Sequence, residues 1–281
     1  MILITGASGR VPRRTAELLA RNGCILRLMT RSPQNAPKLT AAQTVRGDFA
    51  EPATLADAFA GVTTALVVSA SGEPGARARL HRNAFQAAAQ AGVQHVVYLS
   101  LQGAAPDSMY PYSREHFLSE QYLLATGLSC TILRNAFYLD MFLEKFKAEN
   151  VVRGPAKNGR GAFVSREDVA RTAAAALLKK PSGIYDLTGP ESLSVADIAE
   201  RLSAIMQRDL RYEDEPAGTT RERLSKRESL AWRVDLAVGW FEAIAAGDLE
   251  RVSENVQHFT GAAPLNLDDY SKAFPELFRP L

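Results

Sequence analysis

The sequence is poor in cysteine, nearly balanced in charge and free of long apolar runs, and each shortage excludes a class of protein. Only Cys24 and Cys130 occur among the 281 residues, which excludes a disulfide framework. We expect both thiols to be reduced within strands and the protein to be cytoplasmic. The 33 basic and 31 acidic residues leave a net charge of +2, too little to predict binding to nucleic acid or to a membrane surface.

Signals for a metal, a membrane span or secretion are also missing. No apolar stretch approaches membrane-spanning length, and the first residues have the pattern of a core strand rather than of a signal peptide. The four histidines are scattered, with no paired cysteines or H-E-x-x-H spacing, so we predict no metal site. A content of 46% hydrophobic and 23% charged residues predicts a globular protein with ample length for a core.

The first residues carry the most informative pattern, in which an apolar run leads into a glycine-containing loop. Residues 2–5 are predicted to form a strand, Gly6 and Gly9 follow, and a helix is expected next. This arrangement gathers backbone N–H groups and the positive end of a helix dipole at one point, where a pyrophosphate binds. The pattern predicts a dinucleotide contacted by Gly6, Ser8, Gly9, Arg10 and Val11.

Pro12 stands where the third small residue of such a loop is expected. Glycine at that position lets the helix pack closely on the sheet. Proline in the first turn of a helix loses only an N–H that has no partner within the helix. We therefore expect the loop to keep its function, while the sequence leaves the effect of Pro12 on cofactor affinity open.

Strand and helix patterns alternate through the first half of the chain. This alternation predicts an α/β fold with a Rossmann-type, doubly wound parallel sheet of order 3-2-1-4-5-6. The expected strands are 2–5, 24–30, 44–46, 65–69, 95–100 and 130–134, and the expected helices are 12–22, 55–59, 76–91 and 112–126.

The pattern changes after residue 135 and predicts a small, mostly helical C-terminal lobe that binds substrate. Residues 1–135, with 162–188 returning to them, form the expected NAD(P)-binding domain; 136–161 and 189–281 form the substrate lobe. Ser165 and Ser194 are expected N-caps of helices. The further expected elements are helices 141–146, 166–178, 195–206 and 232–246, strands 184–187 and 210–213, and a loop over 154–161.

The residue after the second strand selects between the two nicotinamide cofactors. Arg31 occupies that position without a nearby carboxylate, and a basic side chain there pairs with a 2′-phosphate. We therefore predict NADP(H), with Arg10 directed at the same phosphate. Asp48 and Phe49 follow the third strand, where a carboxylate and the next N–H can bind adenine; the alternative is that Asp48 caps the following helix. Ser69 and Ala70 end the fourth strand beside the expected cofactor.

The chemical centre is expected beyond the fifth and sixth strands. Ser100 ends the fifth strand, and Tyr112 and His116 lie four residues apart on one helical face. A tyrosine beside a cation can give a proton to a carbonyl while the nicotinamide delivers hydride, so both are candidate catalytic residues. The alternative is that Tyr112 packs and His116 caps or is solvated. Phe137, Tyr138 and Phe142 follow the sixth strand and suit a flat apolar substrate.

The chain resembles the NmrA-like branch of the atypical short-chain dehydrogenases, most closely NAD(P)H:quinone oxidoreductases and triphenylmethane reductases. Matching blocks follow one another in family order over about residues 1–205. The most specific is Leu-Arg-Asn-Ala-Phe-Tyr at 133–138, and others are Thr-Gly-Ala-Ser-Gly at 5–9, Gly-Asp-Phe at 47–49 and Val-Ser-Arg-Glu-Asp-Val-Ala at 164–170.

The resemblance implies NADPH in a cleft between a Rossmann domain and a small lobe. It places Arg31 near the ribose phosphate and Asn135 to Tyr138 near the nicotinamide and substrate. The chain departs from the family at Pro12, which replaces glycine, and at His116, where many relatives have lysine.

These patterns favour an NADPH-dependent reductase that transfers hydride to a quinone, dye or similar flat electrophile. The partner predicted is a small-molecule substrate, and the sequence leaves homodimer formation open. A non-catalytic NADP(H) sensor of NmrA type is the alternative. A sugar-nucleotide epimerase or dehydratase is weaker, because it normally uses a Tyr-x-x-x-Lys pair and His116 follows Tyr112 here.

Overall fold

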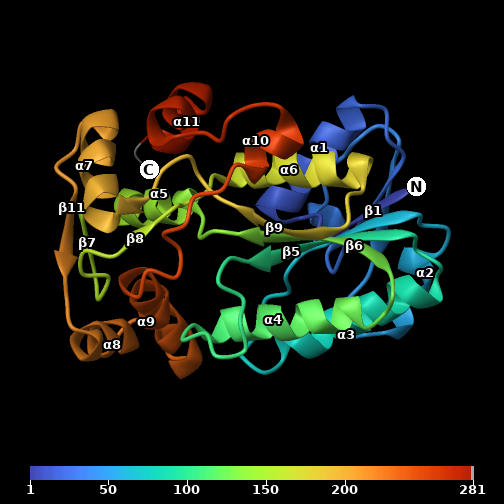
Figure 1. Cartoon of the computed structure of the whole chain (residues 1–281), viewed down its shortest axis with the longest axis horizontal. Coiled ribbons are helices and arrows are strands. Elements are labelled where there is room, and N and C mark those ends of the chain that lie inside the picture. Colours follow the sequence, from blue (N-terminus) through green and yellow to red (C-terminus); the bar gives the residue numbers. More distant parts are fainter. Residues whose placement is uncertain (280–281) are drawn as a thin grey trace.

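The computed structural model describes residues 1–279, and a seven-stranded parallel sheet forms its centre (Figure 1). The strand order β3-β2-β1-β4-β5-β6-β9 confirms the predicted doubly wound fold and adds β9 at one edge. The strands are β1 (Ile2–Thr5), β2 (Leu26–Thr30), β3 (Ala42–Arg46), β4 (Thr64–Val67), β5 (His95–Leu101), β6 (Ser129–Asn135) and β9 (Gly183–Leu187).

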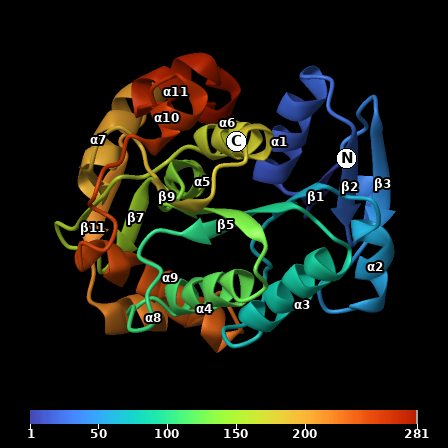
Figure 2. The ribbon, with the colours of Figure 1, turned by 45° about the vertical axis from the view of Figure 1, so that its right-hand side comes forward.

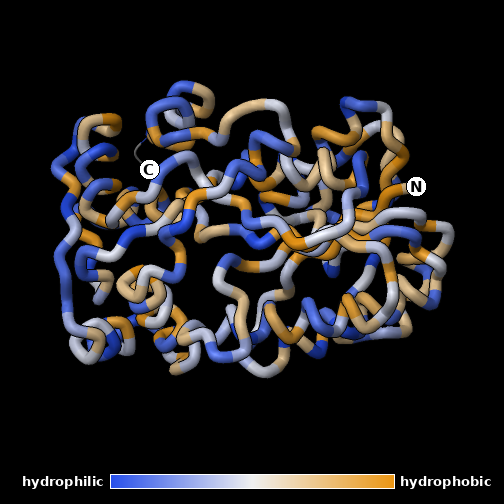
Figure 3. Tube along the Cα trace, viewed as in Figure 1, coloured by the Kyte–Doolittle hydropathy of each residue, from blue (hydrophilic) through white to orange (hydrophobic). Residues whose placement is uncertain are grey.

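Continuous apolar runs explain why the inner strands lie at the centre of the sheet. Every residue of β4 is buried, and β5 is buried from His95 to Ser100. Parallel strands covered on both faces require such runs, since neither face meets water. The hydrophobic colouring of the tube in Figure 3 follows these central strands, whereas the outer segment around β11 is largely hydrophilic.

Helices cover both faces of the sheet and bury two separate apolar clusters against it. One layer contains α1 (Arg10–Arg21), α6 (Arg166–Lys179) and α10 (Asn255–Thr260). The other contains α2 (Ala53–Phe59), α3 (Arg77–Gln90) and α4 (Pro111–Leu124). Figure 1 shows these layers above and below the strands. All of these helices except α10, which has no predicted counterpart, begin and end within two residues of the predicted bounds.

A third apolar cluster is formed by segments at the end of the sheet away from the N-terminus, and the turned view in Figure 2 shows where these segments lie. Most of the segments that follow β6 pack against one another around this cluster. The elements at this end are α5 (Leu139–Ala148), α7 (Val195–Met206), α8 (Ala217–Ser225), α9 (Ala231–Ala245), α11 (Leu267–Ala273) and the short strands β7 (Val151–Gly154), β8 (Arg160–Gly161), β10 (Leu193–Ser194) and β11 (Arg211–Asp214), and all of them except α8 and β8 have residues in the cluster or packed against it.

The expected loop over 154–161 is wrong at both ends. Gly154 ends β7, which pairs in parallel with β11, and Arg160–Gly161 forms β8, which pairs antiparallel with β10. In each pair the two strands are far apart in the sequence, so no local periodicity predicts the pairing. The division into a cofactor domain and a substrate lobe stays a prediction, although α6 and β9 do belong to the central layers.

The expected helix caps are confirmed by hydrogen bonds. The Ser165 hydroxyl accepts the backbone N–H of Asp168 at the start of α6. Ser194 and Asp197 form a reciprocal capping box at the start of α7. These caps fix where each helix begins, and the α6 cap directs the Arg166 backbone and side chain toward α5.

Within residues 1–279, no helix combines the length and apolar character that a membrane crossing needs.

Candidate active site

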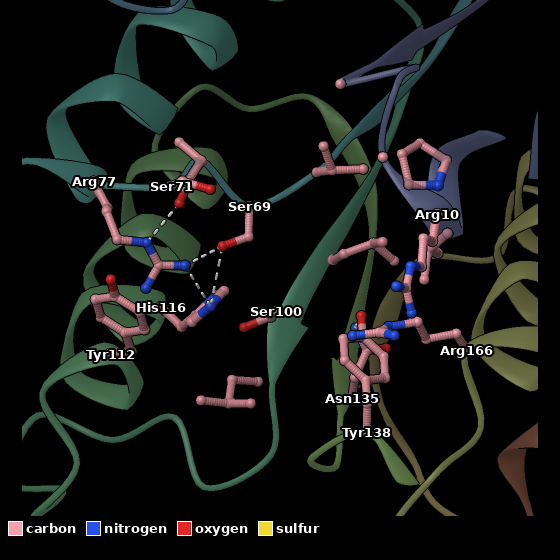
Figure 4. Close-up of a pocket in the computed structure, with 18 of the residues that line it drawn as sticks. Arg10, Ser69, Ser71, Arg77, Ser100, Tyr112, His116, Asn135, Tyr138 and Arg166 are labelled. Atoms are coloured by element: carbon pink, nitrogen blue, oxygen red, sulfur yellow. Dashed lines mark hydrogen bonds between the residues drawn. The ribbon is translucent and has the colours of Figure 1, made fainter. Parts of the chain in front are cut away.

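A cavity of about 780 Å³ opens at the carboxyl ends of β1, β2, β4, β5 and β6 (Figure 4). Its volume lies within the range of small-molecule and cofactor sites, and its place is where ligands bind in open α/β sheets. All the residues predicted for cofactor, catalysis or substrate line it except Phe142. They are Gly6, Ser8, Gly9, Arg10, Val11, Arg31, Asp48, Phe49, Ser69, Ala70, Ser100, Tyr112, His116, Asn135, Phe137 and Tyr138.

The glycine loop is closed by a backbone turn that only glycine can make here. Gly6 has a φ of +60°, and a Cβ added to it would lie 2.6 Å from Cγ2 of Val68. The Gly9 N–H donates to the Gly6 carbonyl at 2.8 Å. The resulting bare backbone at the start of α1 is the kind of surface that a pyrophosphate can approach.

Pro12 is the third residue of α1, because the helix begins at Arg10 rather than at Pro12 as predicted. The first intrahelical bond is the one from Arg13 N–H to the Gly9 carbonyl. Pro12 therefore lies in the turn whose N–H groups have no helical partner, and its missing donor removes no bond of α1. Its ring lines the cavity beside Gly9.

The residues predicted to bind the nucleotide differ in their burial and in whether they already form hydrogen bonds within the protein. Arg31 is exposed at the cavity edge just after β2. Asp48 Oδ1 accepts the Ala50 N–H at 2.9 Å, so part of this carboxylate organises the turn before α2. Phe49 is buried and lines the cavity.

An ion-pair bridge that the sequence does not indicate crosses the cavity edge. Glu144 of α5 accepts hydrogen bonds from Arg10 in the glycine loop and from Arg166 of α6, the latter at 2.6 Å. Burial opposes ionisation of Glu144, but the two guanidinium groups outweigh it and lower the pKa of the carboxyl below its usual value. The bridge ties α5 and α6 in the second half of the chain to the first residue of α1.

Ser100 is held by a buried ion pair. Its hydroxyl donates to Glu120 at 2.5 Å, and Arg134 donates to both oxygens of the same carboxylate, at 2.9 and 2.6 Å. Glu120 is fully buried. The proton of Ser100 is therefore directed into α4, and only its oxygen lone pairs remain for a ligand.

The structure does not bring Tyr112 and His116 into hydrogen-bond contact, although they share a helix face as predicted. The Tyr112 hydroxyl donates to the Gly72 carbonyl at 2.7 Å. The cation beside its ring is Arg77, whose guanidinium carbon lies 3.7 Å from the ring centroid. Burial raises the pKa of the Tyr112 phenol, and the charge of Arg77 only partly opposes that rise.

His116 is a buried, uncharged member of a second network. Its Nδ1 lies 2.9 Å from the Tyr98 hydroxyl, and its Nε2 lies 3.2 Å from Nη2 of Arg77. Burial, together with the charge of Arg77, holds the pKa of His116 well below its usual value. The expected cation at this position is therefore wrong, because an imidazolium N–H would point at a guanidinium N–H.

The far end of the cavity is a wall of contacting aromatic rings, here called the aromatic wall: Tyr112, Tyr110, Phe137 and Trp240. Neighbouring ring centroids are 5.8, 5.4 and 5.6 Å apart in that order. All four residues line the cavity. Phe142 instead lies behind it, fully buried against Phe163 and Trp240, because the α5 face that carries it turns toward the third core.

Asn135 supplies a buried acceptor between the glycine loop and the aromatic wall. Its amide nitrogen lies 3.4 Å from the Tyr138 hydroxyl, while its Oδ1 is buried with no hydrogen-bond partner in residues 1–279. A ligand donor at that point would satisfy Oδ1. With four arginines and two carboxylates in the lining, the residues present fit an anionic dinucleotide. The described residues contain no group of three or more side chains that could hold a metal ion.

Comparison with known proteins identifies the ligand class. The protein family described as NAD(P)H-binding matches residues 6–180. This chain belongs to that family. The NAD(P)H azoreductase of Xenophilus azovorans is 30% identical over 289 residues, covering 99% of both chains. Quinone oxidoreductase 2 of Escherichia coli (strain K12) is 33% identical over 225 residues, covering 76% of this chain and 77% of that one.

Solved structures agree with this assignment. The NADPH-dependent quinone oxidoreductase of Escherichia coli in complex with NADPH aligns with a TM-score of 0.88 at 26% identity, covering 99% of this chain and 100% of that one. The Citrobacter sp. triphenylmethane reductase complexed with NADP(H) has the same fold, with a TM-score of 0.87 at 23% identity over 97% and 99% of the two chains. The resemblance inferred from the sequence is thereby confirmed, and NAD(P)H is the cofactor class.

We predict that Gly6→Ala weakens cofactor binding, because the added methyl group meets Val68 and displaces the loop backbone. The dissociation constant for NADPH, measured by fluorescence titration, should rise at least about tenfold. Gly23→Ala is the matched control: Gly23 also has a positive φ, +73°, but a methyl group added there would have no neighbour within 4 Å. Both variants should lose about 1 kcal/mol from backbone strain, whereas equal cofactor affinity in the two would contradict the assignment of the loop.

Proposed function

We propose that this NAD(P)H-dependent oxidoreductase uses NADPH to reduce quinones, dyes or similar flat electrophiles. The observation that carries the proposal is that one cavity joins the glycine loop to the aromatic wall. Flat aromatic acceptors stack on such rings, and a cofactor along the strand ends lies beside them. The azoreductase and quinone oxidoreductase names of the relatives support the same class of acceptor.

The cofactor, when bound, supplies a hydride, and the protein's part is to orient the acceptor and exclude water. The acceptor takes up the hydride, which is one hydrogen with two electrons, and a quinone takes up one further proton from solvent to become the hydroquinone. Phe137 and Trp240 stack on each other at an interplanar angle of 30°, and the aromatic wall that they help to form is where we place the flat acceptor. Reduction of a quinone requires little beyond such orientation.

The predicted catalytic pair, Tyr112 and His116, has indirect roles in this proposal. Tyr112 forms one end of the aromatic wall, and its hydroxyl donates a hydrogen bond to the Gly72 carbonyl. His116 accepts a hydrogen bond from Arg77 and holds that side chain in place. Neither side chain has a proton directed at the space in front of the aromatic wall.

The NADP(H) sensor remains the second candidate, and one observation favours it. The hydroxyl protons of Ser100 and Tyr112 are both committed to protein acceptors, and His116 is uncharged. A protein that only binds the cofactor has no need of a proton donor in this cavity. The sensor and the reductase therefore differ in turnover and not in cofactor affinity.

Mixing the purified protein with NADPH and a panel of quinones, azo dyes and triphenylmethane dyes tests the proposal. We expect the absorbance of reduced nicotinamide to fall only when an acceptor is present, and saturably with acceptor concentration. Calorimetry measures NADPH binding in parallel. Tight binding with no turnover of any acceptor would decide for the sensor.

Arg31→Glu should reverse the preference for the phosphorylated cofactor, because a carboxylate replaces the charge that we place beside the 2′-phosphate. The ratio of kcat/KM for NADPH over NADH should fall by about 10- to 100-fold. Lys38→Glu makes the same change of charge at an exposed residue outside the cavity and should leave the ratio near that of the wild type. An unchanged ratio in Arg31→Glu would remove this residue from the cofactor site.

Tyr112→Phe should keep most of the quinone reductase activity, since the hydroxyl it removes is already bound to Gly72. We expect kcat to stay well within tenfold of the wild-type value, whereas removal of a general acid costs about 100-fold or more. Steady-state kinetics with one neutral quinone at saturating NADPH give the comparison. A loss in the larger range would restore Tyr112 as the proton donor.

A further inference from the structure

Arg77 is a buried cation in the cavity wall, and the reductase proposal does not yet use it. It is the first residue of α3 and is only 4% exposed. Its Nε donates to the Ala70 carbonyl at 2.7 Å, and its Nη2 contacts Ser69 and His116. Its Nη1 is buried with no hydrogen-bond partner in residues 1–279. Figure 4 shows the guanidinium between Ser69, His116 and the Tyr112 ring.

The charge of Arg77 has no carboxylate partner within 4.0 Å among the described residues, where buried arginines normally have one. Glu115 of α4 lies nearby, but its two oxygens accept the backbone N–H groups of Gly75 and Ala78 at the start of α3. A helix N-terminus is also an unfavourable place for a cation. Stability alone therefore does not account for an arginine at this position.

The surrounding groups hold the guanidinium without neutralising it. His116 contributes a ring nitrogen that accepts from Nη2, which requires an uncharged imidazole. His81 is fixed by the Ala70 N–H on its Nε2 at 2.8 Å, and burial lowers its pKa to about 3. Tyr98 lies between the two imidazoles, 2.9 Å from His116 and 3.2 Å from His81. The network thus leaves the positive charge of Arg77 at the cavity with no carboxylate within 4.0 Å among the described residues, because the nearby Glu115 is bound to the backbone before and in α3.

That charge lies at one end of the aromatic wall. The guanidinium stacks on Tyr112, and the contacts continue through Tyr110 and Phe137 to Trp240. A flat acceptor on this wall would extend an acidic substituent at its edge toward the cation. Hydrogen bonds from arginine to an anionic oxygen are among the strong ones in proteins. The Nη1 amino group has no partner among the described residues, so its N–H groups can donate to such an oxygen.

We propose that Arg77 binds an anionic oxygen on the acceptor, so that the preferred acceptors are flat aromatic molecules carrying a sulfonate or carboxylate. The proposal rests on the reductase function proposed above and names its substrate class. Arg77 is then a specificity-determining residue that binds the acceptor, and it takes no part in the transfer of hydride.

The test compares two acceptors of similar size and shape, the anionic 2-sulfonate and the neutral 2-sulfonamide of 1,4-naphthoquinone, and the change that each variant makes relative to the wild type is measured for each acceptor. We expect Arg77→Gln to lower kcat/KM for the sulfonate by about 10- to 100-fold through KM, and to change the sulfonamide far less. Arg77→Lys should recover part of the loss. Arg79→Gln is the matched control, because Arg79 is exposed on the same helix and lies outside the cavity lining.

Three results would overturn the proposal. An equal loss for both acceptors would give Arg77 a structural role, and no loss for either would remove it from the acceptor site. A rise in the dissociation constant for NADPH without a change in acceptor preference would assign Arg77 to the cofactor. Thermal unfolding of each variant shows whether the network survives the substitution.

Measurements on the wild-type protein separate this proposal from the reductase function and do not need a folded variant. With NADP⁺ present, naphthalene-2-sulfonate should quench tryptophan fluorescence at a concentration at least about tenfold lower than its sulfonamide does. Equal affinities would refute the role of Arg77 even if quinones are reduced. Failure of every acceptor to turn over, with the sulfonate still preferred, would refute the reductase and keep the anion site.

Discussion

The parallel register of the central sheet is the constraint on which the rest of the site depends. All seven strands run in the same direction, so Gly6, Ser69, Ser100 and Asn135, which are far apart in the sequence, follow strands that end at one edge. The helices that cover both faces leave that edge open. A cavity forms there because the second half of the chain packs beyond the strand ends and closes the space from the other side.

The cavity is closed from the far side by contacts between residues that are far apart in the sequence. Tyr110 and Phe137 belong to the segments before α4 and after β6, whereas Trp240 comes from α9. Glu144 of α5 adds an ionic contact to Arg10 at the start of α1. The acceptor end of the cavity is thus built by elements that are distant in the sequence. Its shape depends on the packing of the third apolar core rather than on the Rossmann layers.

The sequence predicts the Rossmann part well because its information is local. Glycines stop helices at Gly23, Gly92 and Gly127, where the structure has positive φ values, and buried strands appear as apolar runs. The strand expected over 210–213 is present as β11, but the pairings β7–β11 and β8–β10 escape prediction because each depends on a partner far along the chain. Proximity in the sequence groups Phe142 with Phe137 and Tyr138, but the α5 helix turns it into the core. The cofactor loop, in contrast, needs only residues that are consecutive.

Arg77 and His116 show why the remaining part of the site is not accessible to sequence reasoning. The sequence suggests a cation at His116 because this residue follows Tyr112 by one helical turn. In the structure the cation beside Tyr112 comes from α3, and its Nη2 lies 3.2 Å from the ring of His116. Two adjacent buried positive charges would repel each other in a medium of low dielectric constant. A lysine at position 116 would therefore be incompatible with Arg77 as it is placed here, whereas a neutral imidazole can accept its hydrogen bond. The departure from lysine and the buried arginine are two parts of one arrangement, and only the three-dimensional packing of α3 against α4 makes that visible.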